Sequence, residues 1–419
     1  MSTVLLLSNG HGEDLSAAAL GRQLQERGIA VDAMPLVGRG QAFRQAGIPV
    51  WGPTRDFSTG GLGYTSLAAR LTDLREGQFT YVFSRLSRLW RQRRRIALVV
   101  AVGDLVPLLG AWLSRRPSVI YLVAYSSHYE GRLRLPWPCG WLLRRPNVRA
   151  IWSRDRLTAT DLSEQLRRPV RFLGNPFLDP LLEGPPDDRA AVAAAVAAEQ
   201  PRRPVVAVLP GSRMPEALAN LALLLRVLAR LPAEGREPGP RLQAALVGAL
   251  DAQTVAAMAA PLGWRLQPGE PIALERGGLR LELHWGAFER VLRCSDLVLA
   301  MSGTASEQAV ALARPVLQVA GRGPQFTAGF AEAQRRLLGD GVVCASGPVG
   351  EPATLEASAR LLVAMLKRLA DPAQAARWRR ELEAIAAERL GGAGGSAAMA
   401  AAIMELLDAQ ARPDTTPMP

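Results

Sequence analysis

The stretch DLVLAMSGTASEQAVALARP (residues 296–315) joins a short apolar run directly to a helical pattern. Its first part, Leu297–Ala300, predicts a buried strand, and the small polar residues Ser302, Gly303 and Thr304 predict the turn that follows. A lone carboxylate, Glu307, is then expected in the first turn of the helix. A strand followed at once by a helix is the repeating unit of α/β folds.

Similar apolar runs recur along the chain, with longer helical patterns between them. Runs rich in Val, Ile and Leu without polar alternation are typical of parallel strands buried on both faces. The first half predicts strands at 4–8, 30–37, 96–102, 119–124, 150–153 and 170–173, with a helix at 13–27 after the first strand. The second half predicts strands at 205–209, 244–247, 297–300, 315–319 and 342–345, followed by helix from 352 to 410.

The chain has 419 residues, which is too long for one ordinary core. The two successive strand–helix sets predict an α/β protein with two Rossmann-like doubly wound domains that face an interdomain cleft. We expect the first domain at 1–180, a Pro- and Ala-rich linker at 181–204 and the second domain at 205–392. Residues 393–410 predict a C-terminal helix that packs back on the first domain, and 411–419 a flexible tail. Ligands of such sheets bind beyond the carboxyl ends of the strands, so the strand-exit loops are the candidate sites.

Two strand-exit loops of the second half are suited to a nucleotide. In one of them, Gly211 allows close backbone approach, Ser212 offers a hydroxyl, and Arg213 presents a planar fork that matches phosphate oxygens. In the other, residues 302–304 open a helix whose N-terminal amides suit a phosphate, with Glu307 near enough to accept hydrogen bonds from a ribose. Each loop alone is also consistent with an ordinary capped helix. Together they favour a site for a sugar nucleotide.

Two loops of the first half could carry chemistry. Gly10 and Gly12 flank His11, but no third glycine completes a dinucleotide fingerprint, so this loop is better suited to an acceptor hydroxyl. His11 could act as a general base or only as a structural donor. Asp104 follows an apolar strand and could accept a proton or orient a base, but it could equally cap the next helix.

The net charge of +12 is confined to the first half of the chain. Residues 1–180 carry 25 arginines and 13 acidic residues, whereas 181–419 carry 25 basic and 25 acidic residues. The arginines of 85–95 and 131–146 alternate with Trp90, Trp137 and Trp141, a pattern typical of a membrane interface. A nucleic-acid surface and a merely solvated charged face are the alternatives, but no nucleic-acid-binding motif is visible. We therefore expect an anionic membrane surface as a partner, and no nucleic acid.

The apolar run IALVVAVGDLVPLLGAWL (96–113) has the length of a membrane span. Gly103-Asp104 in its middle and Pro107 after it favour a strand, a turn and a helix instead. The N-terminal residues lack a basic region and a cleavage site, so we expect no signal peptide.

Several enzyme classes are excluded by missing motifs. There is no GxxxxGK[ST], and Lys367 is the only lysine, which excludes a phosphate-loop NTPase. GxSxG and HExxH are absent as well. Cys139, Cys294 and Cys344 match no metal-site spacing and indicate free thiols in a reducing compartment. We expect no metal and no cofactor.

The motifs together resemble the GT-B glycosyltransferases, most closely the lipid-A-disaccharide synthase family. VAVLPGSRMPE (206–216) is similar to the family's LLPGSR-x-x-E, FLGNPFLD (172–179) to its (I/V)G(H/N)P-x-x-D, and SGTASEQA (302–309) to its SGTATLEA. GRGPQFT (321–327) looks like the family's late donor-site loop. The first loop, SNGHGED, departs from the family's AGE-x-SGD, and its His11 resembles the His in the GT-B enzyme that makes lipid II.

The resemblance implies an inverting, metal-independent transfer of a GlcNAc-type sugar from a UDP-sugar to a lipid-linked acceptor. A protein of this kind would be cytoplasmic and peripheral on the inner face of the cytoplasmic membrane. Donor binding would fall to Gly211, Ser212, Arg213, Ser302, Gly303, Thr304, Glu307 and Gln325, catalysis to Asp104 or His11, and acceptor contacts to Gly10, Gly12 and Asn175. The rival functions are a UDP-sugar epimerase on the same fold and a non-catalytic membrane-surface binding protein.

Overall fold

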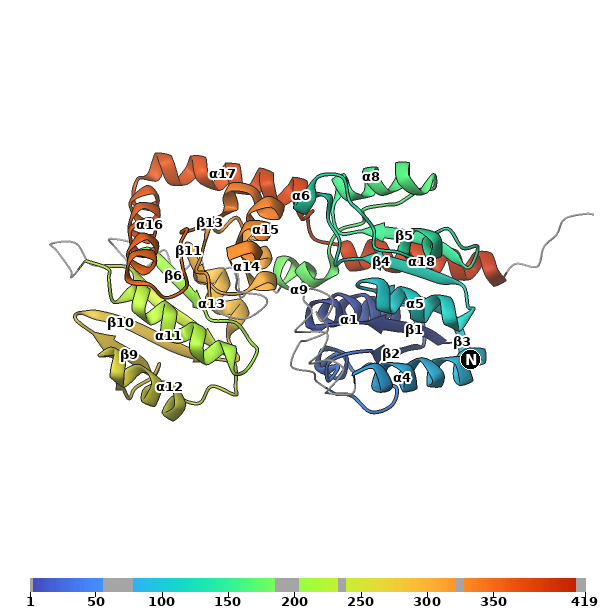
Figure 1. Cartoon of the computed structure of the whole chain (residues 1–419), viewed down its shortest axis with the longest axis horizontal. Helices are drawn as coiled ribbons and strands as arrows, with labels where there is room; N and C mark the ends of the chain where they lie inside the picture. Colours follow the sequence, from blue (N-terminus) through green and yellow to red (C-terminus); the bar gives the residue numbers. More distant parts are fainter. Residues whose placement is uncertain (1–2, 56–77, 185–202, 233–238, 322–327, 412–419) are drawn as a thin grey trace, which may run out of the picture. The chain divides into compact units, whose positions relative to one another are not determined.

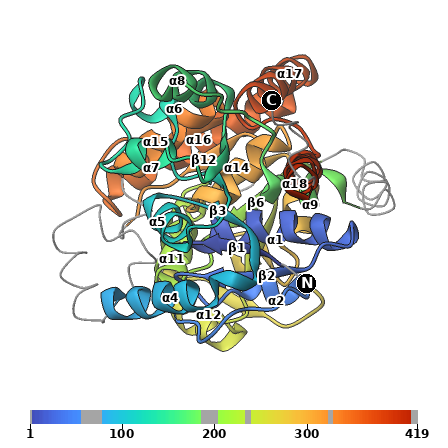
Figure 2. The ribbon, with the colours of Figure 1, turned by 90° about the vertical axis from the view of Figure 1, so that its right-hand side faces the viewer.

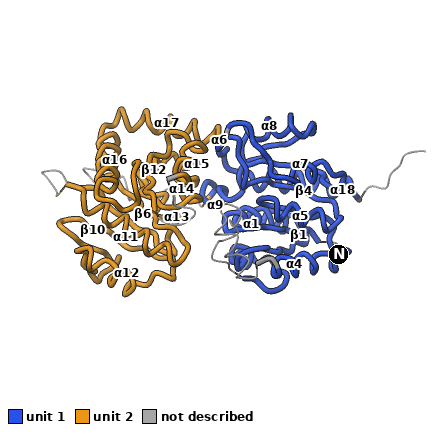
Figure 3. Tube along the Cα trace, in the orientation of Figure 1, with its two compact units in different colours: residues 1–183, 390–419 blue, residues 184–389 orange. Residues whose placement is uncertain are grey.

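The computed structural model describes residues 3–55, 78–184, 203–232, 239–321 and 328–411. The chain divides into two compact units (Figure 3): unit 1 comprises Met1–Glu183 with Leu390–Pro419, and unit 2 comprises Gly184–Arg389. Residues 185–202 of the predicted linker (181–204) and 412–419 of the predicted tail lie outside the described residues.

Unit 1 is built on a five-stranded sheet in the order β2-β1-β3-β4-β5, and every pairing in it is parallel. The strands are apolar and buried on both faces, as their sequences predict, and the prediction for 96–102 matches the observed bounds of its strand. They are β1 (Thr3–Ser8), β2 (Val31–Pro35), β3 (Ile96–Val102), β4 (Ser118–Leu122) and β5 (Val148–Ser153).

Helices cover both faces of this sheet (Figure 1). One face packs against α1 (His11–Glu26), α2 (Gln41–Gln45) and α18 (Gly395–Ala411). The other packs against α4 (Gln78–Gln92), α5 (Leu105–Ser114), α7 (Cys139–Leu143) and α8 (Arg156–Leu166). The short helices α6 (Ser127–Glu130) and α9 (Asp179–Glu183) complete the unit.

The C-terminal helix α18 belongs to unit 1 although unit 2 precedes it in sequence. Figure 2 shows it beside α1, and Met399 and Ile403 join the same core as Val4 and Leu6. The expectation of continuous helix at 352–410 is met by three helices rather than one. A Pro and a glycine-rich stretch interrupt them, giving α16 (Pro352–Ala370), α17 (Pro372–Arg389) and α18.

Unit 2 has an eight-stranded sheet in the order β13-β12-β11-β6-β7-β10-β9-β8. Its strands are β6 (Val205–Leu209), β7 (Arg241–Leu246), β8 (Arg265–Gln267), β9 (Ala273–Arg276), β10 (Leu279–Trp285), β11 (Leu297–Ala300), β12 (Val316–Gln318) and β13 (Val342–Cys344). The remaining helices are α11 (Glu216–Leu228), α12 (Ala252–Ala259), α13 (Phe288–Cys294), α14 (Gly303–Ala311) and α15 (Ala328–Leu338).

One strand prediction is corrected, and three strands were missed. Residues 170–173 form only an isolated bridge between Arg171 and Trp152, because Pro169 and the Gly174-Asn175-Pro176 turn leave no room for a ladder. The strands β8, β9 and β10 were not predicted. The β9–β10 hairpin turns at Gly277-Gly278, both with positive φ, which is the signal of a two-residue hairpin loop.

The apolar run 96–113 forms a strand, a turn and a helix, as predicted. Within the parts of the chain that the structure describes, we find no helix with the length and apolarity needed to cross a bilayer.

Candidate functional site

The predicted loops lie where the strand order of each sheet reverses direction. In unit 1 the chain builds β2 on one side of β1 and β3 on the other, so the reversal lies between β1 and β3. In unit 2 it lies between β6 and β11. Such reversal points are where open α/β sheets bind their ligands, because the two exit loops separate and leave a crevice.

In unit 2 the exit loops of β6 and β11 are held side by side. Leu209 and Ala300 are register partners in parallel strands, and the amide of Met301 donates to the carbonyl of Leu209 at 2.9 Å. The β6 loop turns at Gly211, whose φ of 96° disfavours other residues. Buried Asn220 on α11 fixes this loop by donating to the carbonyl of Pro210 at 2.9 Å. The sequence prediction that these loops share one sheet edge is confirmed.

Among the described residues, no side chain caps the N-terminus of α14. Ser302 occupies the cap position without a side-chain hydrogen bond, and Ser306 Oγ donates to the Ser302 carbonyl at 2.6 Å. Residues 302–304 are partly exposed. The positive end of α14 therefore lacks a cap from Ser302, which makes its first amides a candidate anion site. Gly303 is required for close packing, because a Cβ there would lie 2.8 Å from Phe330 Cζ.

Glu307 lies deeper in the helix than its sequence suggested. Since α14 begins at Gly303, Glu307 is its fifth residue, and the prediction of a first-turn carboxylate is wrong. The sequence misplaced the helix start because a strand exit and a helix cap use the same small polar residues. The side chain is buried, with 7% of its surface exposed. Gln325, the other predicted donor contact, lies outside the described residues.

Two buried glutamines beside α14 were missed by sequence reasoning. Gln318 ends β12 as the register partner of Ala300, and Gln334 Nε2 lies 3.7 Å from the Cβ position of Gly303. Their Oε1 atoms are buried and accept no hydrogen bond from the described part of the chain. A glutamine at the carboxyl end of an apolar strand was the signal available for Gln318.

In unit 1 the exit loops of β1 and β3 are joined by side chains. Asn9 Nδ2 donates to both carboxylate oxygens of Asp104, at 3.2 and 3.1 Å. Asp104 also caps α5 by accepting the amide of Val106 at 2.8 Å. The turn before it needs Gly103, with φ at 137°. Asp104 is 5% exposed. Of its two predicted roles, the helix cap is therefore observed.

Glu13 occupies the space between these two loops, and sequence reasoning gave it no positive role. A Cβ on Gly10 would lie 2.5 Å from Glu13 Oε2, and a Cβ on Gly103 would lie 3.3 Å from Glu13 Cγ. His11 is exposed as the first residue of α1, and Gly12 follows it. The second acid of the loop is structural, because Ser8 Oγ donates to Asp14 Oδ1 at 2.5 Å within the core.

Tyr125 and Cys139 support the start of α5. Tyr125 Oη accepts the amide of Leu105 at 3.2 Å and lies 4.0 Å from Cys139 Sγ. Burial raises the pKa of Tyr125 far above its ordinary value and that of Cys139 to about 11, so both groups stay protonated near neutral pH.

The structure contradicts the predicted acceptor role of Asn175. Its side chain is fully buried; Oδ1 accepts from Tyr121 Oη at 2.6 Å, and Nδ2 donates to the carbonyls of Arg154 at 3.0 Å and Leu390 at 2.6 Å. Asp179, in the same motif, accepts the amides of residues 394–396. The motif therefore anchors the C-terminal helix, and the polar side-chain atoms of Asn175 and Asp179 form hydrogen bonds within the fold.

The three predicted membrane tryptophans lie on the face of unit 1 that carries α4, α5 and α7. Trp90 is 38% exposed, Trp141 46% and Trp137 89%. Trp112 joins them and packs edge-on against Trp141, with ring centroids 5.9 Å apart. Guanidinium groups stack on these rings: Arg93 on Trp90 at 3.4 Å and Arg145 on Trp141 at 3.5 Å.

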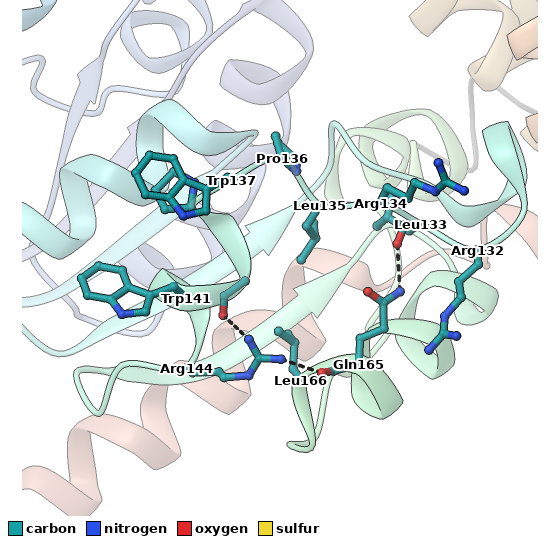
Figure 4. A pocket seen from close by; sticks show the side chains of 12 residues that line it. Arg132, Leu133, Arg134, Leu135, Pro136, Trp137, Trp141, Arg144, Gln165 and Leu166 are labelled. Atoms are coloured by element: carbon teal, nitrogen blue, oxygen red, sulfur yellow. Dashed lines mark hydrogen bonds between the residues drawn. The ribbon is translucent and has the colours of Figure 1, made fainter.

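A surface pocket of about 780 Å³ adjoins this face (Figure 4). Arg144 closes one side by donating to the carbonyls of Gly140 at 3.0 Å and Gln165 at 2.7 Å. Arg132, Arg134, Trp137 and Trp141 also line it. Among the described residues, no group of three or more His, Cys, Asp or Glu side chains is placed to hold a metal ion.

Comparison with known proteins supports the predicted architecture. No family model matches the chain. It is 35% identical over 188 residues to lipid-A-disaccharide synthase of Alkalilimnicola ehrlichii, and the match spans 43% of this chain and 44% of that relative, so less than half of either protein is aligned.

Solved structures cover nearly the whole chain. The calicheamicin glycosyltransferase CalG4 superimposes with a TM-score of 0.59 at 18% identity, covering 98% of this chain and all of that one. MurG of Acinetobacter baumannii gives 0.55 at 16%, covering 97% and 100%. The UDP-GlcNAc 2-epimerase of Neisseria meningitidis, bound to UDP-GlcNAc, gives 0.51 at 15%, covering 96% and 100%. The chain has the two-domain α/β fold of GT-B glycosyltransferases.

Proposed function

We propose that this protein is an inverting, metal-independent glycosyltransferase. It moves a sugar, of the GlcNAc type, from a UDP-sugar to a lipid-linked or amphiphilic acceptor at a membrane surface. The observation that carries the proposal is the pairing of the Pro210–Arg213 loop with the uncapped start of α14 at the reversal point of the unit 2 sheet.

The donor is bound in unit 2. The open amides of α14 and the guanidinium of Arg213 take the diphosphate, and Ser212, Ser302 and Thr304 supply hydroxyls. Glu307 accepts hydrogen bonds from the ribose. In the inverting step, the same fixed positive groups stabilise the departing UDP in place of a metal ion. No other cofactor is needed.

The acceptor is bound at the reversal point of unit 1. We assign the general base to His11, because it is exposed at the first position of α1, whereas Asp104 is buried as the cap of α5. The oxygen of the acceptor hydroxyl attacks the anomeric carbon and UDP leaves, while His11 accepts the proton of that hydroxyl. Asp104 holds the β1 and β3 loops together.

The exposed tryptophans and the arginines stacked on them bind the membrane surface that carries the acceptor lipid. Trp90, Trp137 and Trp141 enter the interfacial layer of the bilayer, while arginine side chains contact anionic headgroups. The protein is then peripheral on the inner face of the cytoplasmic membrane. The partial likeness to a lipid-A-disaccharide synthase supports a lipid acceptor.

The donor assignment is tested by calorimetric titration with UDP. Arg213→Ala and Glu307→Gln should each weaken UDP binding at least tenfold, while Arg226→Gln on the neighbouring α11 should leave it unchanged. Unchanged affinity in both site variants would overturn the donor site.

A UDP-sugar epimerase is the second candidate, favoured by the structural likeness to an epimerase and by the acids at the unit 1 loops. Incubation with UDP-GlcNAc alone separates the two functions, because an epimerase turns over without an acceptor. A glycosyltransferase leaves the sugar configuration unchanged until an acceptor lipid is added.

A further inference from the structure

Helix α4 carries an arginine where its core-facing stripe calls for an apolar residue. Arg85 and Leu89 are one turn apart on the same side of α4, with 1% and 0% of their surfaces exposed. Arg85 is among the largest fully buried side chains of the described chain. Charged residues are almost never buried to this extent unless they are paired.

The guanidinium of Arg85 is poorly satisfied. Its Nε and Nη1 are buried without a hydrogen-bond partner in the described part of the chain, and Nη2 reaches only the carbonyl of Pro35, at 3.5 Å. Burial lowers the pKa of Arg85 below its ordinary value. A buried cation without an anion is costly to fold, so its presence needs a compensating interaction.

A second guanidinium converges on the same point. A Cβ on Gly52 would overlap Nη1 of Arg85 and would lie 2.9 Å from Nη1 of Arg88. Gly52 has φ at 68° and leaves room for both groups. Two like charges so close repel each other unless an anion lies between them.

These groups line a pocket of about 640 Å³ beside α4. Arg91, Ser84 and Pro53 also line it, and none of the described residues that line it is acidic. Phe83 forms an apolar rim with 72% of its surface exposed. Pro35 is the register partner of Ser8, so Arg85 reaches the carboxyl edge of the sheet where the β1 loop begins.

We propose that this pocket binds a phosphate monoester carried on an apolar chain. Arg85 and Arg88 take the phosphate oxygens, and Phe83 contacts the chain. Phosphate is favoured because a dianion balances two guanidinium groups, whose planar forks match its oxygens. The inference rests on the proposed function in one respect: in a glycosyltransferase the phosphate belongs to the amphiphilic acceptor.

The decisive variant is Arg85→Met, which keeps the length of the side chain and removes its charge. Octyl phosphate below its micelle concentration should bind the wild-type protein, and Arg85→Met should weaken that binding at least tenfold while the melting temperature stays equal or rises. If Arg85 serves to bind a ligand, removing its buried charge should not lower the stability of the free protein. If Arg85 serves the fold, the same change should lower it. Unchanged affinity would overturn the proposal, whatever the melting temperature.

Two further variants control this result. Arg88→Gln, on an exposed side chain, should weaken octyl phosphate binding several-fold without affecting the fold, and it replaces the first variant if Arg85→Met does not fold. Arg22→Met, at an exposed position of α1 on the opposite face of the sheet, should change neither affinity nor melting temperature.

A comparison of several ligands distinguishes a phosphate on an apolar chain from free phosphate and from a lipid headgroup. Octanol should not bind, and inorganic phosphate should bind more weakly than octyl phosphate; equal binding of octanol would refute an anion site. Arg85→Met could instead bind phosphatidic acid in phosphatidylcholine vesicles more weakly while its affinity for octyl phosphate stays unchanged. That result would show that Arg85 contacts bilayer headgroups, and it would overturn the proposed pocket site. UDP titration is independent: intact UDP binding with a failed phosphate test sinks only this inference, whereas phosphate binding without UDP binding sinks only the proposed function.

Discussion

Asn9 and Asp104 lie 95 residues apart in sequence and are joined by a two-pronged hydrogen bond, in which Asn9 Nδ2 donates to both carboxylate oxygens at 3.2 and 3.1 Å. The contact ties the exit of β1 to the exit of β3 at the point where the strand order of unit 1 reverses. Asp104 caps α5 as well, so one buried carboxylate fixes two loops and a helix start. This arrangement predicts a positioning role for Asp104.

Replacing Asp104 should separate positioning from proton transfer. Asp104→Asn keeps a good helix cap, and its new amide can donate to Asn9 Oδ1, which is buried without a partner among the described residues. We expect this variant to fold normally and to retain transfer within tenfold, whereas His11→Gln should lose about 10²–10⁴-fold in rate. The measurement is initial-rate kinetics with a UDP-sugar and a lipid acceptor. If Asp104→Asn lost as much activity as His11→Gln, Asp104 would be the base.

Gly103→Ala should displace Glu13 from between the two loops. The new Cβ would lie 3.3 Å from Glu13 Cγ and from Pro107 Cγ, and φ at 137° is strained for alanine. We expect a loss of about 1–3 kcal/mol in the free energy of unfolding together with reduced transfer. Gly28→Ala is the matched control, because its φ of 79° is also left-handed but nothing lies within 4 Å of the new Cβ. Equal losses of activity in the two variants would show that Glu13 has no part in the site.

Sequence patterns predicted the parallel strands well because burial on both faces leaves an unbroken apolar run, as in Val205–Leu209 and Leu297–Ala300. They missed β8, β9 and β10 on one side of the unit 2 sheet. Arg265–Gln267 is short and half-exposed, and Leu279–Trp285 alternates apolar with polar residues instead of forming an unbroken apolar run. The candidate loops followed from the strands, since every exit of a parallel sheet lies at the same edge.

Side-chain roles were less accessible than the loops. The motif containing Asn175 and Asp179 looks the same in sequence whether its polar atoms face a ligand or the backbone of a distant helix, and only the fold brings residues 390–396 beside it. Arg85 lies in a run of arginines in which composition cannot show which one is buried. Contacts between residues far apart in sequence decide both cases.

Asp179 should be a main determinant of how firmly α18 is attached. Its carboxylate accepts the amides of Gly394, Gly395 and Ser396 at 3.0, 3.1 and 2.6 Å, which caps the helix start with a buried anion. Asp179→Ala should lower the free energy of unfolding by about 2 kcal/mol, the upper end for a lost cap. Hydrogen exchange of the amides in 395–405 should accelerate. Glu183→Ala, an exposed carboxylate on the same short helix, should change neither quantity, and a similar effect there would remove the case for specific capping.

Glu282 should make unit 2 sensitive to acid. His284 Nε2 lies 3.3 Å from Glu282 Oε2 and, with Gln243 donating to the same oxygen at 3.0 Å, lowers the pKa of Glu282 to about 2 against the opposing effect of burial. Arg290 donates to His284 Nδ1 at 3.1 Å, which leaves the Nε2 proton for Glu282.

A carboxylate whose pKa is lower in the folded than in the unfolded state stabilises the fold fully above its ordinary pKa of 4.5, and this stabilisation is lost as the pH falls toward about 2. Denaturant unfolding at pH 6 and pH 2.5 should therefore show a smaller acid-induced loss in Glu282→Gln than in the wild type, by about 1–2 kcal/mol once solvent screening of the partly exposed pair is allowed for. Glu275→Gln on the adjacent strand, whose partner Arg280 is exposed, should match the wild type, and an equal loss at pH 2.5 in the wild type and Glu282→Gln would contradict the assignment.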